Sequence, residues 1–311
     1  MGITANNTLL RQPKIPLFCF VSIRVILDAK QERGIAMARR KKKSDSKLVL
    51  RWVIALSAVL IVMAVLAITL KQCESLAEPA GPSTTPAPTL APNPYGVEDF
   101  GYDDRGYLTC LAGESIPGID VSSHQGDIDW PAVKAAGMEF AFIRVGYRGY
   151  DSGTIHADEK ALQNLAGAKA AGLEIGAYFF SQALTEGEAI EEAQFALEML
   201  GGVELDLPLV YDWEYVSESA RTGQMEADTL MACVKAFCGE VEQAGYKPMI
   251  YFNQELSKTL LDITKLSEYP FWLAMYSGEM SFPYQIDFWQ YSDEGQVDGI
   301  EGNVDLDLYF P

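Results

Sequence analysis

The sequence predicts an α/β fold of the barrel type, preceded by a single transmembrane helix and a proline-rich linker. Three observations lead to this prediction. From residue 116 onward, short apolar runs typical of strands alternate with longer segments of helical periodicity. Residues 52–70 carry no charge, and residues 75–95 contain six prolines among small side chains. Repeated strand–helix alternation favours a closed parallel sheet, in which reactive groups lie at the carboxyl ends of the strands.

Capping and turn residues mark where individual elements begin and end. Asp129 is expected to cap one helix, which Gly137 ends, and Thr185 with Glu188 forms a capping box before the next long amphipathic segment. Two consecutive glycines after residue 200 end that helix. The predicted strands are 116–121, 140–147, 173–180, 207–216, 247–252, 270–276, 288–291 and 304–308, and the predicted helices are 130–136, 158–171, 185–200 and 226–244.

The amino-terminal part has the pattern of a signal anchor. As a helix, the uncharged stretch would be about 28 Å long, close to the roughly 30 Å hydrocarbon core of a bilayer. Seven Lys/Arg residues precede it within residues 39–51 and only Lys71 follows closely, so the amino end is expected in the cytoplasm. A cleaved signal peptide is the competing interpretation, although its apolar core is usually about 7 to 15 residues. We also expect Met37 to be the physiological start.

These patterns divide the chain into four predicted parts. They are a basic cytoplasmic segment (1–47), a transmembrane signal-anchor helix (48–70), an extracellular Pro/Ala/Thr-rich linker (71–112) and the barrel (113–311).

Charge and composition exclude several functions for the barrel. Residues 72–311 contain 11 Lys/Arg against 40 Asp/Glu, so they would repel the phosphates of nucleic acids. The chain has only two histidines, His124 and His156, and no CxxC spacing, which excludes histidine-rich metal hydrolases and predicts no metal or cofactor. Cys233 and Cys238 are expected to be buried apolar residues of a helix.

The segment 207–216, LPLVYDWEYV, carries the strongest candidates for catalysis. Asp212 and Glu214 lie two positions apart, so in a strand they share one face about 6 to 7 Å apart. Two carboxyls in one cleft can divide the acid and base roles at a glycosidic bond. The bulky neighbours Val210, Tyr211, Trp213 and Tyr215 are expected to desolvate Glu214 and raise its pKa. The alternative is a strand that ends in solvent with two ordinary acidic residues.

Further candidates lie at other strand ends. Asp120 ends the first predicted strand and Asp305 lies in the last, so both are expected at the same mouth of the barrel. His124 follows two serines without a GxSxG motif and is expected in a loop or pocket wall. Five aromatic residues are candidates for stacking on sugar rings, with the core as the alternative: Tyr147, Tyr178, Trp272, Tyr276 and Trp289.

Seven segments, in order, resemble glycoside hydrolase family 25, the bacterial and phage lysozymes. They are GIDVSSHQGDIDW, FAFIRVGYRG, IGAYFFS, LPLVYDWE, FWLAMYS, FWQYS and VDGIEGNVDLDLYF, and together they cover about residues 116–310. The resemblance implies a modified TIM-like barrel with fewer helices than the regular eightfold form. It also implies hydrolysis of the β-1,4 bond between N-acetylmuramic acid and N-acetylglucosamine in peptidoglycan. Combined with the anchor, this predicts a single-pass protein of the cell membrane whose catalytic domain is extracellular.

Carried over by motif, the resemblance assigns roles to the four acidic candidates. It implies Glu214 as the general acid, Asp212 as its partner carboxylate, and Asp120 with Asp305 as further acids that line the site. One position departs from the family pattern, because Asp307 stands where the family commonly has Asn.

Two alternative functions stay open from the sequence. One is a wall-binding or scaffold module that keeps the cleft without catalysis. The other is a glycosidase for chitin, although Pro208 and Val210 stand where family 18 chitinases need acidic residues.

Overall fold

The computed structural model describes residues 90–311. The predictions for the basic segment, the transmembrane helix and the linker up to residue 89 lie outside this range. Within the described part, no helix combines the length and apolarity needed to cross a bilayer.

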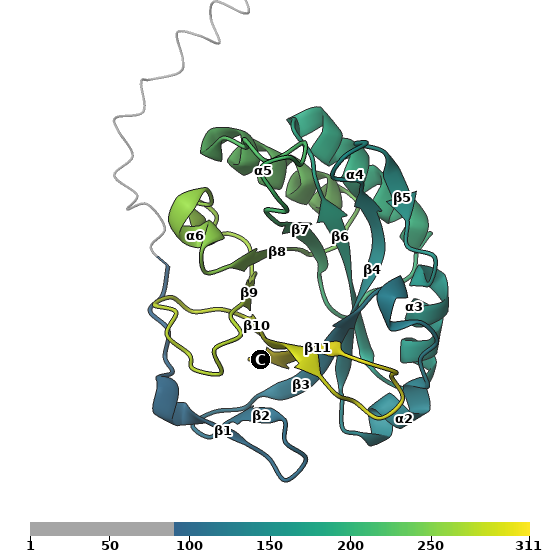
Figure 1. Cartoon of the computed structure of the whole chain (residues 1–311), viewed down its shortest axis with the longest axis vertical. Helices are drawn as coiled ribbons and strands as arrows, with labels where there is room; N and C mark the ends of the chain where they lie inside the picture. The colour runs from purple at the N-terminus through teal and green to yellow at the C-terminus, as the bar shows by residue number, and fades with distance from the viewer. Residues whose placement is uncertain (1–89) are drawn as a thin grey trace, which may run out of the picture. The chain divides into compact units, whose positions relative to one another are not determined.

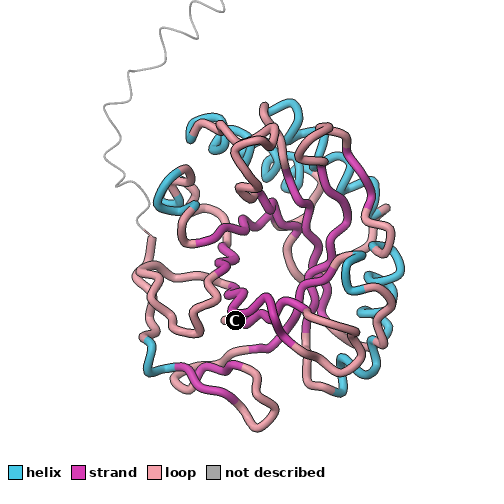
Figure 2. The backbone as a smooth tube through the Cα atoms, viewed as in Figure 1, coloured by secondary structure: helices cyan, strands magenta, loops and turns pink. Residues whose placement is uncertain are grey.

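Eight strands close into a barrel, seen along its axis as a ring in Figures 1 and 2. Seven consecutive strands of the ring are parallel, and β3 pairs with β4 to begin the series. The last strand, β11, is antiparallel to both of its neighbours, so the barrel is mixed. The barrel strands are β3 (Ile116–Val121), β4 (Phe140–Arg148), β6 (Glu174–Ser181), β7 (Leu209–Trp213), β8 (Pro248–Asn253), β9 (Phe271–Ala274), β10 (Phe288–Gly295) and β11 (Val304–Tyr309).

The reversal of β11 determines where one candidate residue lies. In a parallel strand Asp305 would be near the closed end of the barrel, because it is the second residue of β11. Since β11 is antiparallel, its amino end lies at the rim formed by the carboxyl ends of the other strands. The register places Asp305 directly opposite Asp120 of β3. The expectation that the two acids share one mouth is therefore met, by a reversed strand that the alternation pattern does not predict.

Helices cover one side of the ring more than the other. In Figure 1, α2 to α5 lie along β4, β6 and β7, whereas loops and a short hairpin face β9 to β11. The predicted caps form, since Asp129 Oδ1 accepts a hydrogen bond from the Ala132 amide and Thr185 Oγ1 accepts one from the Glu188 amide. The helices are α2 (Trp130–Ala135), α3 (Ala161–Ala170), α4 (Glu186–Leu200), α5 (Ala227–Gln243) and α6 (Leu256–Thr259).

Strand alternation separates two apolar layers. In β7, Val210 belongs to a cluster inside the barrel, whereas Tyr211 and Trp213 pack into the larger core between the sheet and the helices. Aromatic rings fill the closed end of the interior, where Phe142 stacks on Trp272 with ring centroids 4.7 Å apart. The cavity that holds the candidate acids lies at the opposite rim.

The folded unit begins before the predicted boundary at residue 113. Two three-residue strands, β1 (Phe100–Tyr102) and β2 (Leu108–Cys110), form an antiparallel hairpin. Leu108 is buried, and the Phe100 ring meets Trp289 edge-on at 5.1 Å. Residues 90–112 therefore belong to the globular part, and assigning them to the linker is wrong. Strands of three residues are too short to show periodicity.

Candidate active site

The DxE motif lies at the open rim of the barrel. Asp212 is the fourth residue of β7 and Glu214 follows the strand directly, so both face the mouth. Tyr211 and Trp213 face the helices, and Tyr215 is 52% exposed. The expectation that these three neighbours desolvate Glu214 is therefore wrong, whereas Val210 lies in the barrel interior as that expectation requires. Side chains of other strands, which line the same cavity, add to the burial of Glu214.

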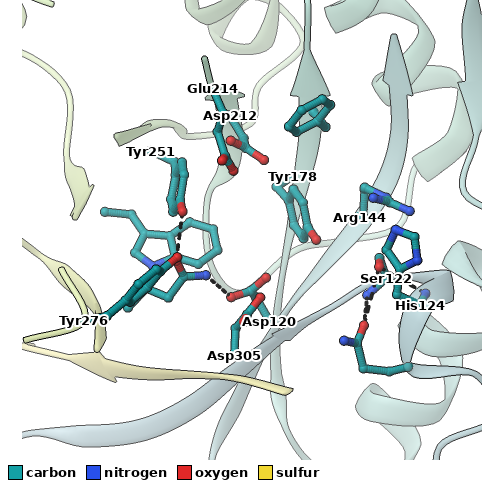
Figure 3. A pocket seen from close by; sticks show the side chains of 14 residues that line it. Asp120, Ser122, His124, Arg144, Tyr178, Asp212, Glu214, Tyr251, Tyr276 and Asp305 are labelled. Carbon is teal, nitrogen blue, oxygen red and sulfur yellow. Dashed lines mark hydrogen bonds between the residues drawn. The ribbon is translucent and has the colours of Figure 1, made fainter. Parts of the chain in front are cut away.

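A cavity of about 230 Å³ brings all four acidic candidates together. In Figure 3, Asp212 and Glu214 lie side by side, and Asp120 with Asp305 forms a second pair across the cavity. They come from three strands widely separated in sequence. The main remaining groups that line the cavity are Arg144, Tyr178, Tyr251, Trp272, Tyr276 and Gln290.

The surroundings of the first carboxyl pair, Asp212 and Glu214, favour its protonated forms. Burial raises the pKa of Asp212 well above its ordinary value, and the charge of Glu214 raises it further, while Arg144 opposes the shift. Burial also raises the pKa of Glu214, and the charge of Asp305 adds to this. Because the two acids are coupled, their protons belong to the pair. Asp212 is 5% exposed, whereas Glu214 is partly exposed.

The second pair shows the same trend. Burial, followed by the charges of Asp305 and Asp307, raises the pKa of Asp120 well above its usual range. Burial raises the pKa of Asp305 to about 6. The cavity therefore concentrates carboxyl groups that share protons at pH values where a solvated carboxyl is fully ionised.

A hydrogen-bonded network fixes Asp120. Gln290 Nε2 donates to Asp120 Oδ2 at 2.6 Å. The hydroxyls of Tyr251 and Tyr276 both donate to Gln290 Oε1 at 2.8 Å, which sets the orientation of this amide. Gln290, Tyr251 and Arg144 are not among the site residues predicted from the sequence. A signal existed, because each is a polar group in an otherwise apolar strand run: FWQYS, KPMIYF and FAFIRVGY.

Comparison with known proteins agrees with this geometry. Residues 119–300 match the model of the family described as glycosyl hydrolases family 25. The chain belongs to this family. It is 30% identical over 195 residues to an autolytic lysozyme of Clostridium acetobutylicum, a match that covers 62% of this chain and 56% of that protein.

Two solved structures are similar to the family 25 barrel of this chain. One is a bacterial lysozyme from Streptomyces coelicolor, with a TM-score of 0.52 and 27% identity over 63% of this chain and 92% of that one. The other is the modular autolysin LytC of Streptococcus pneumoniae in complex with a synthetic peptidoglycan ligand. Its TM-score is 0.57 and its identity 25%, over 68% of this chain and 50% of that one.

Three of the five predicted aromatic residues line the family 25 cavity. Tyr276 is 50% exposed at the rim, and Tyr178 lies beside the acidic pairs. Trp272 contributes to the floor, but its side chain is 1% exposed and packed against Phe142. Tyr276 and Tyr178 are thus the rings that can meet a sugar.

The other two aromatic predictions have different outcomes. Tyr147 lines a neighbouring groove and not the cavity. Trp289 is fully buried in the layer outside the barrel, where its Nε1 donates to the Met275 carbonyl at 2.8 Å. Its assignment to substrate binding is wrong, because its position in β10 alternates to the outer face, opposite to Gln290.

The position that departs from the family pattern faces the barrel interior. Asp307 is fully buried below Asp305, two residues further along β11, and accepts a hydrogen bond from Trp272 Nε1 at 2.8 Å. Its Oδ2 is buried without a hydrogen-bond partner in residues 90–311. Burial and the charge of Asp305 raise the pKa of Asp307 well above its ordinary value. Asp307 therefore lies near the site as an acid whose ionised form is disfavoured.

Groups outside the cavity hold the backbone of Glu214 in place. Gln182 Nε2 donates to the Glu214 carbonyl at 2.9 Å, and Thr222 Oγ1 donates to Gln182 Oε1. Arg221 donates to the Gln182 carbonyl at 2.7 Å and forms an ion pair with Glu188, also at 2.7 Å. These bonds tie the loop after β7 to the start of α4.

Proposed function

We propose that this chain is a membrane-anchored extracellular muramidase, which hydrolyses the β-1,4 bond between N-acetylmuramic acid and N-acetylglucosamine in peptidoglycan. The observation that carries the proposal is the convergence of two carboxyl pairs in one sugar-sized cavity. The family membership supports it, as do the lysozyme names of similar proteins and the peptidoglycan ligand named for LytC.

In this proposal Glu214 is the general acid. Its pKa is raised, it opens to the cavity, and its backbone is fixed, so it can deliver a proton to the glycosidic oxygen as the bond breaks. The leaving sugar departs as an alcohol, and positive charge develops on the remaining ring.

The other carboxyls stabilise that charge. Asp212 lies beside Glu214 and serves either directly at the anomeric carbon or by orienting the acetamido group of the substrate. Asp120, fixed by Gln290, and Asp305 face the same space from the opposite side. Water completes the reaction and returns the proton to Glu214.

The location outside the cell rests on the sequence. The segment 48–70, which carries no charge from residue 52 onward, and the basic residues at and before its start predict one span with the amino end in the cytoplasm. The segment 71–89 then keeps the barrel away from the membrane. Protease treatment of intact and permeabilised cells tests this topology, which predicts that the barrel is digested in both.

Product analysis tests the activity. The full chain, solubilised in detergent, is incubated with purified peptidoglycan, and released fragments are identified by mass spectrometry. New reducing ends at N-acetylmuramic acid support the proposal. Binding to the wall without any release supports a non-catalytic binding module instead, and cleavage of chitin oligomers at an equal rate contradicts the assigned substrate.

A further inference from the structure

A second groove adjoins the carboxyl cavity and takes no part in the proposed reaction. Its volume is about 720 Å³, within the range of small-ligand sites. It shares His124, Arg144 and Phe180 with the cavity, so the two are continuous. Both histidines of the chain line it, since His156 lies on its far wall.

A short added strand builds that far wall. The first half of β4 pairs with β3, and its last residues pair instead with β5 (Ile155–Ala157). In this register Tyr147 lies opposite His156, and their rings stack with centroids 5.1 Å apart. The guanidinium carbon of Arg144 lies 5.2 Å from the centre of the Tyr147 ring. The groove thus holds an aromatic platform between a cation and an imidazole.

Arg144 is fixed in place with donor capacity left over. Its Nε and Nη2 atoms contact the buried carboxylate of Asp158 at 2.9 and 2.8 Å, and Nη2 also donates to Ser123 Oγ. Among residues 90–311, no acceptor is bonded to its Nη1, and neither imidazole side chain forms a hydrogen bond. In Figure 3, Arg144 and His124 lie together on the side of the cavity away from Tyr276.

The lining of this groove offers N–H donors within a strongly acidic domain. Residues 72–311 carry 29 more acidic than basic side chains. Among residues 90–311, Glu159 is the one acidic residue that lines the groove. Arg148 is neutralised by its ion pairs with Glu191 and Glu192, so the donors left for a ligand belong to Arg144 and the two imidazoles. Unused N–H donors of this kind suit a carboxylate ligand.

We propose that the groove binds the acidic stem peptide carried by the N-acetylmuramic acid next to the cleaved bond. This inference rests on the proposed function, because peptidoglycan places a peptide with a free D-glutamate carboxylate on that sugar. The lactyl arm extends from the sugar ring in the cavity into the groove. Arg144, His124 and His156 then donate hydrogen bonds to the carboxylate, and the peptide backbone lies over Tyr147.

Matched substrates test the inference. Three versions of one short glycan are compared: without peptide, with L-Ala-D-Glu, and with the amidated L-Ala-D-isoglutamine. The full chain is expected to cleave the acidic version with a kcat/KM about tenfold above that of the amidated version, the effect of one charge-assisted hydrogen bond. His156→Phe keeps a ring to stack on Tyr147 and removes the donors, so it is expected to reduce this preference severalfold. Lys258→Gln is the control, because it removes an exposed N–H donor group of α6 that lies outside the groove. It is expected to keep the preference for the acidic substrate.

Calorimetric binding of the corresponding disaccharide–peptide fragments gives a second readout that needs no turnover. Tighter binding of the acidic fragment than of the amidated one, with a smaller difference in His156→Phe, supports the peptide site in the groove. This result would hold even if no substrate is cleaved. In that case the proposed function fails and the peptide site stands. Equal kcat/KM and equal affinity for the acidic and amidated forms overturn the inference while cleavage itself is retained. The inference is also overturned if His156→Phe lowers kcat/KM equally on the peptide-free glycan and on the glycan with the acidic peptide, because the groove would then bind sugar.

Discussion

The buried carboxyls of Glu192 and Asp212 are similarly buried but differ in the hydrogen-bond donors around them. Glu192 of α4 is completely buried, and Arg148 Nε, Ser181 Oγ and the Gln182 amide all donate to its carboxylate. In the cavity, Asp212 is nearly as buried, yet its Oδ1 has no partner in residues 90–311. Burial raises the pKa in both places, to about 7 for Glu192.

The difference separates a carboxyl that stabilises the fold from one that we propose takes part in catalysis. Donors around Glu192 offset its burial and join α4 to β4 and β6, so this group stabilises the fold. Within the described part of the chain, Asp212 lacks such donors at its Oδ1, and this unmet hydrogen-bonding capacity lies at a cavity of sugar size. The raised pKa alone does not distinguish the two cases, whereas the partners do.

The largest expected effect is on catalysis. Glu214→Gln keeps the shape of the side chain and removes its acidic proton, so kcat is expected to fall about 10²- to 10⁴-fold. The thermal unfolding midpoint is expected to stay close to that of the wild type, since no partner of the Glu214 carboxylate is lost. Initial rates on purified peptidoglycan measure the first effect and calorimetry the second. Retained full activity would show that the acid is misassigned.

The matched change in the structural carboxyl has the opposite signature. Glu192→Ala leaves Arg148 buried without its main partner, and breaking such a pair costs about 3 to 5 kcal/mol of unfolding free energy. Activity per folded molecule is expected to persist, because Glu192 does not line the cavity. Urea unfolding and active-site-normalised rates check this. A variant that is fully stable but inactive would erase the distinction between the two groups.

The cavity carboxyls also make stability depend on pH. The pKa of Asp305 is about 6 in the folded protein against 3.8 for the free side chain, so the folded state binds the proton more tightly. The contribution of Asp305 to the free energy of unfolding is therefore present below about pH 4 and is lost as the pH rises to about 6. In Asp305→Asn, the change in unfolding free energy between about pH 4 and pH 6 is expected to be smaller by about 1 to 3 kcal/mol. Urea unfolding at several pH values measures it, and an unchanged slope would contradict the assigned environment.

The smallest effect is expected at the position that departs from the family. Asp307→Asn keeps the acceptor for Trp272 Nε1 and removes an acid whose charge raises the pKa of Asp120. The acidic limb of the pH–rate profile is expected to move to lower pH, with less than a tenfold change in maximal rate. A profile that superimposes on that of the wild type would mean that Asp307 has no influence on the site.

Local patterns predicted much of this architecture. The caps at Asp129 and Thr185 and the inward placement of Asp212 with Glu214 follow from adjacent residues. The reversal of β11 and the hairpin of residues 100–110 depend on contacts between distant segments, so no local pattern reveals them. The outward position of Trp289 is a matter of strand register, which aromatic character alone does not specify.

The residues of the candidate site could likewise be predicted only in part from the sequence. The acidic residues were visible as strand-end groups, whereas the amide that fixes Asp120 was visible only as one polar residue in FWQYS. Three of the four neighbours expected to desolvate Glu214 do not do so, because residues an odd number of positions apart in a strand point to opposite faces. Other strands of the closed ring add to the burial of Glu214.

The central claim is that the cavity holds Glu214 protonated at a pH where an ordinary glutamate is ionised. Titration of its side-chain carboxyl by ¹³C NMR, assigned by comparison with Glu214→Gln, tests this most directly. The account predicts that the resonance titrates clearly above 4.5, the value of the unperturbed side chain. A midpoint at or below 4.5 in the folded protein would contradict it.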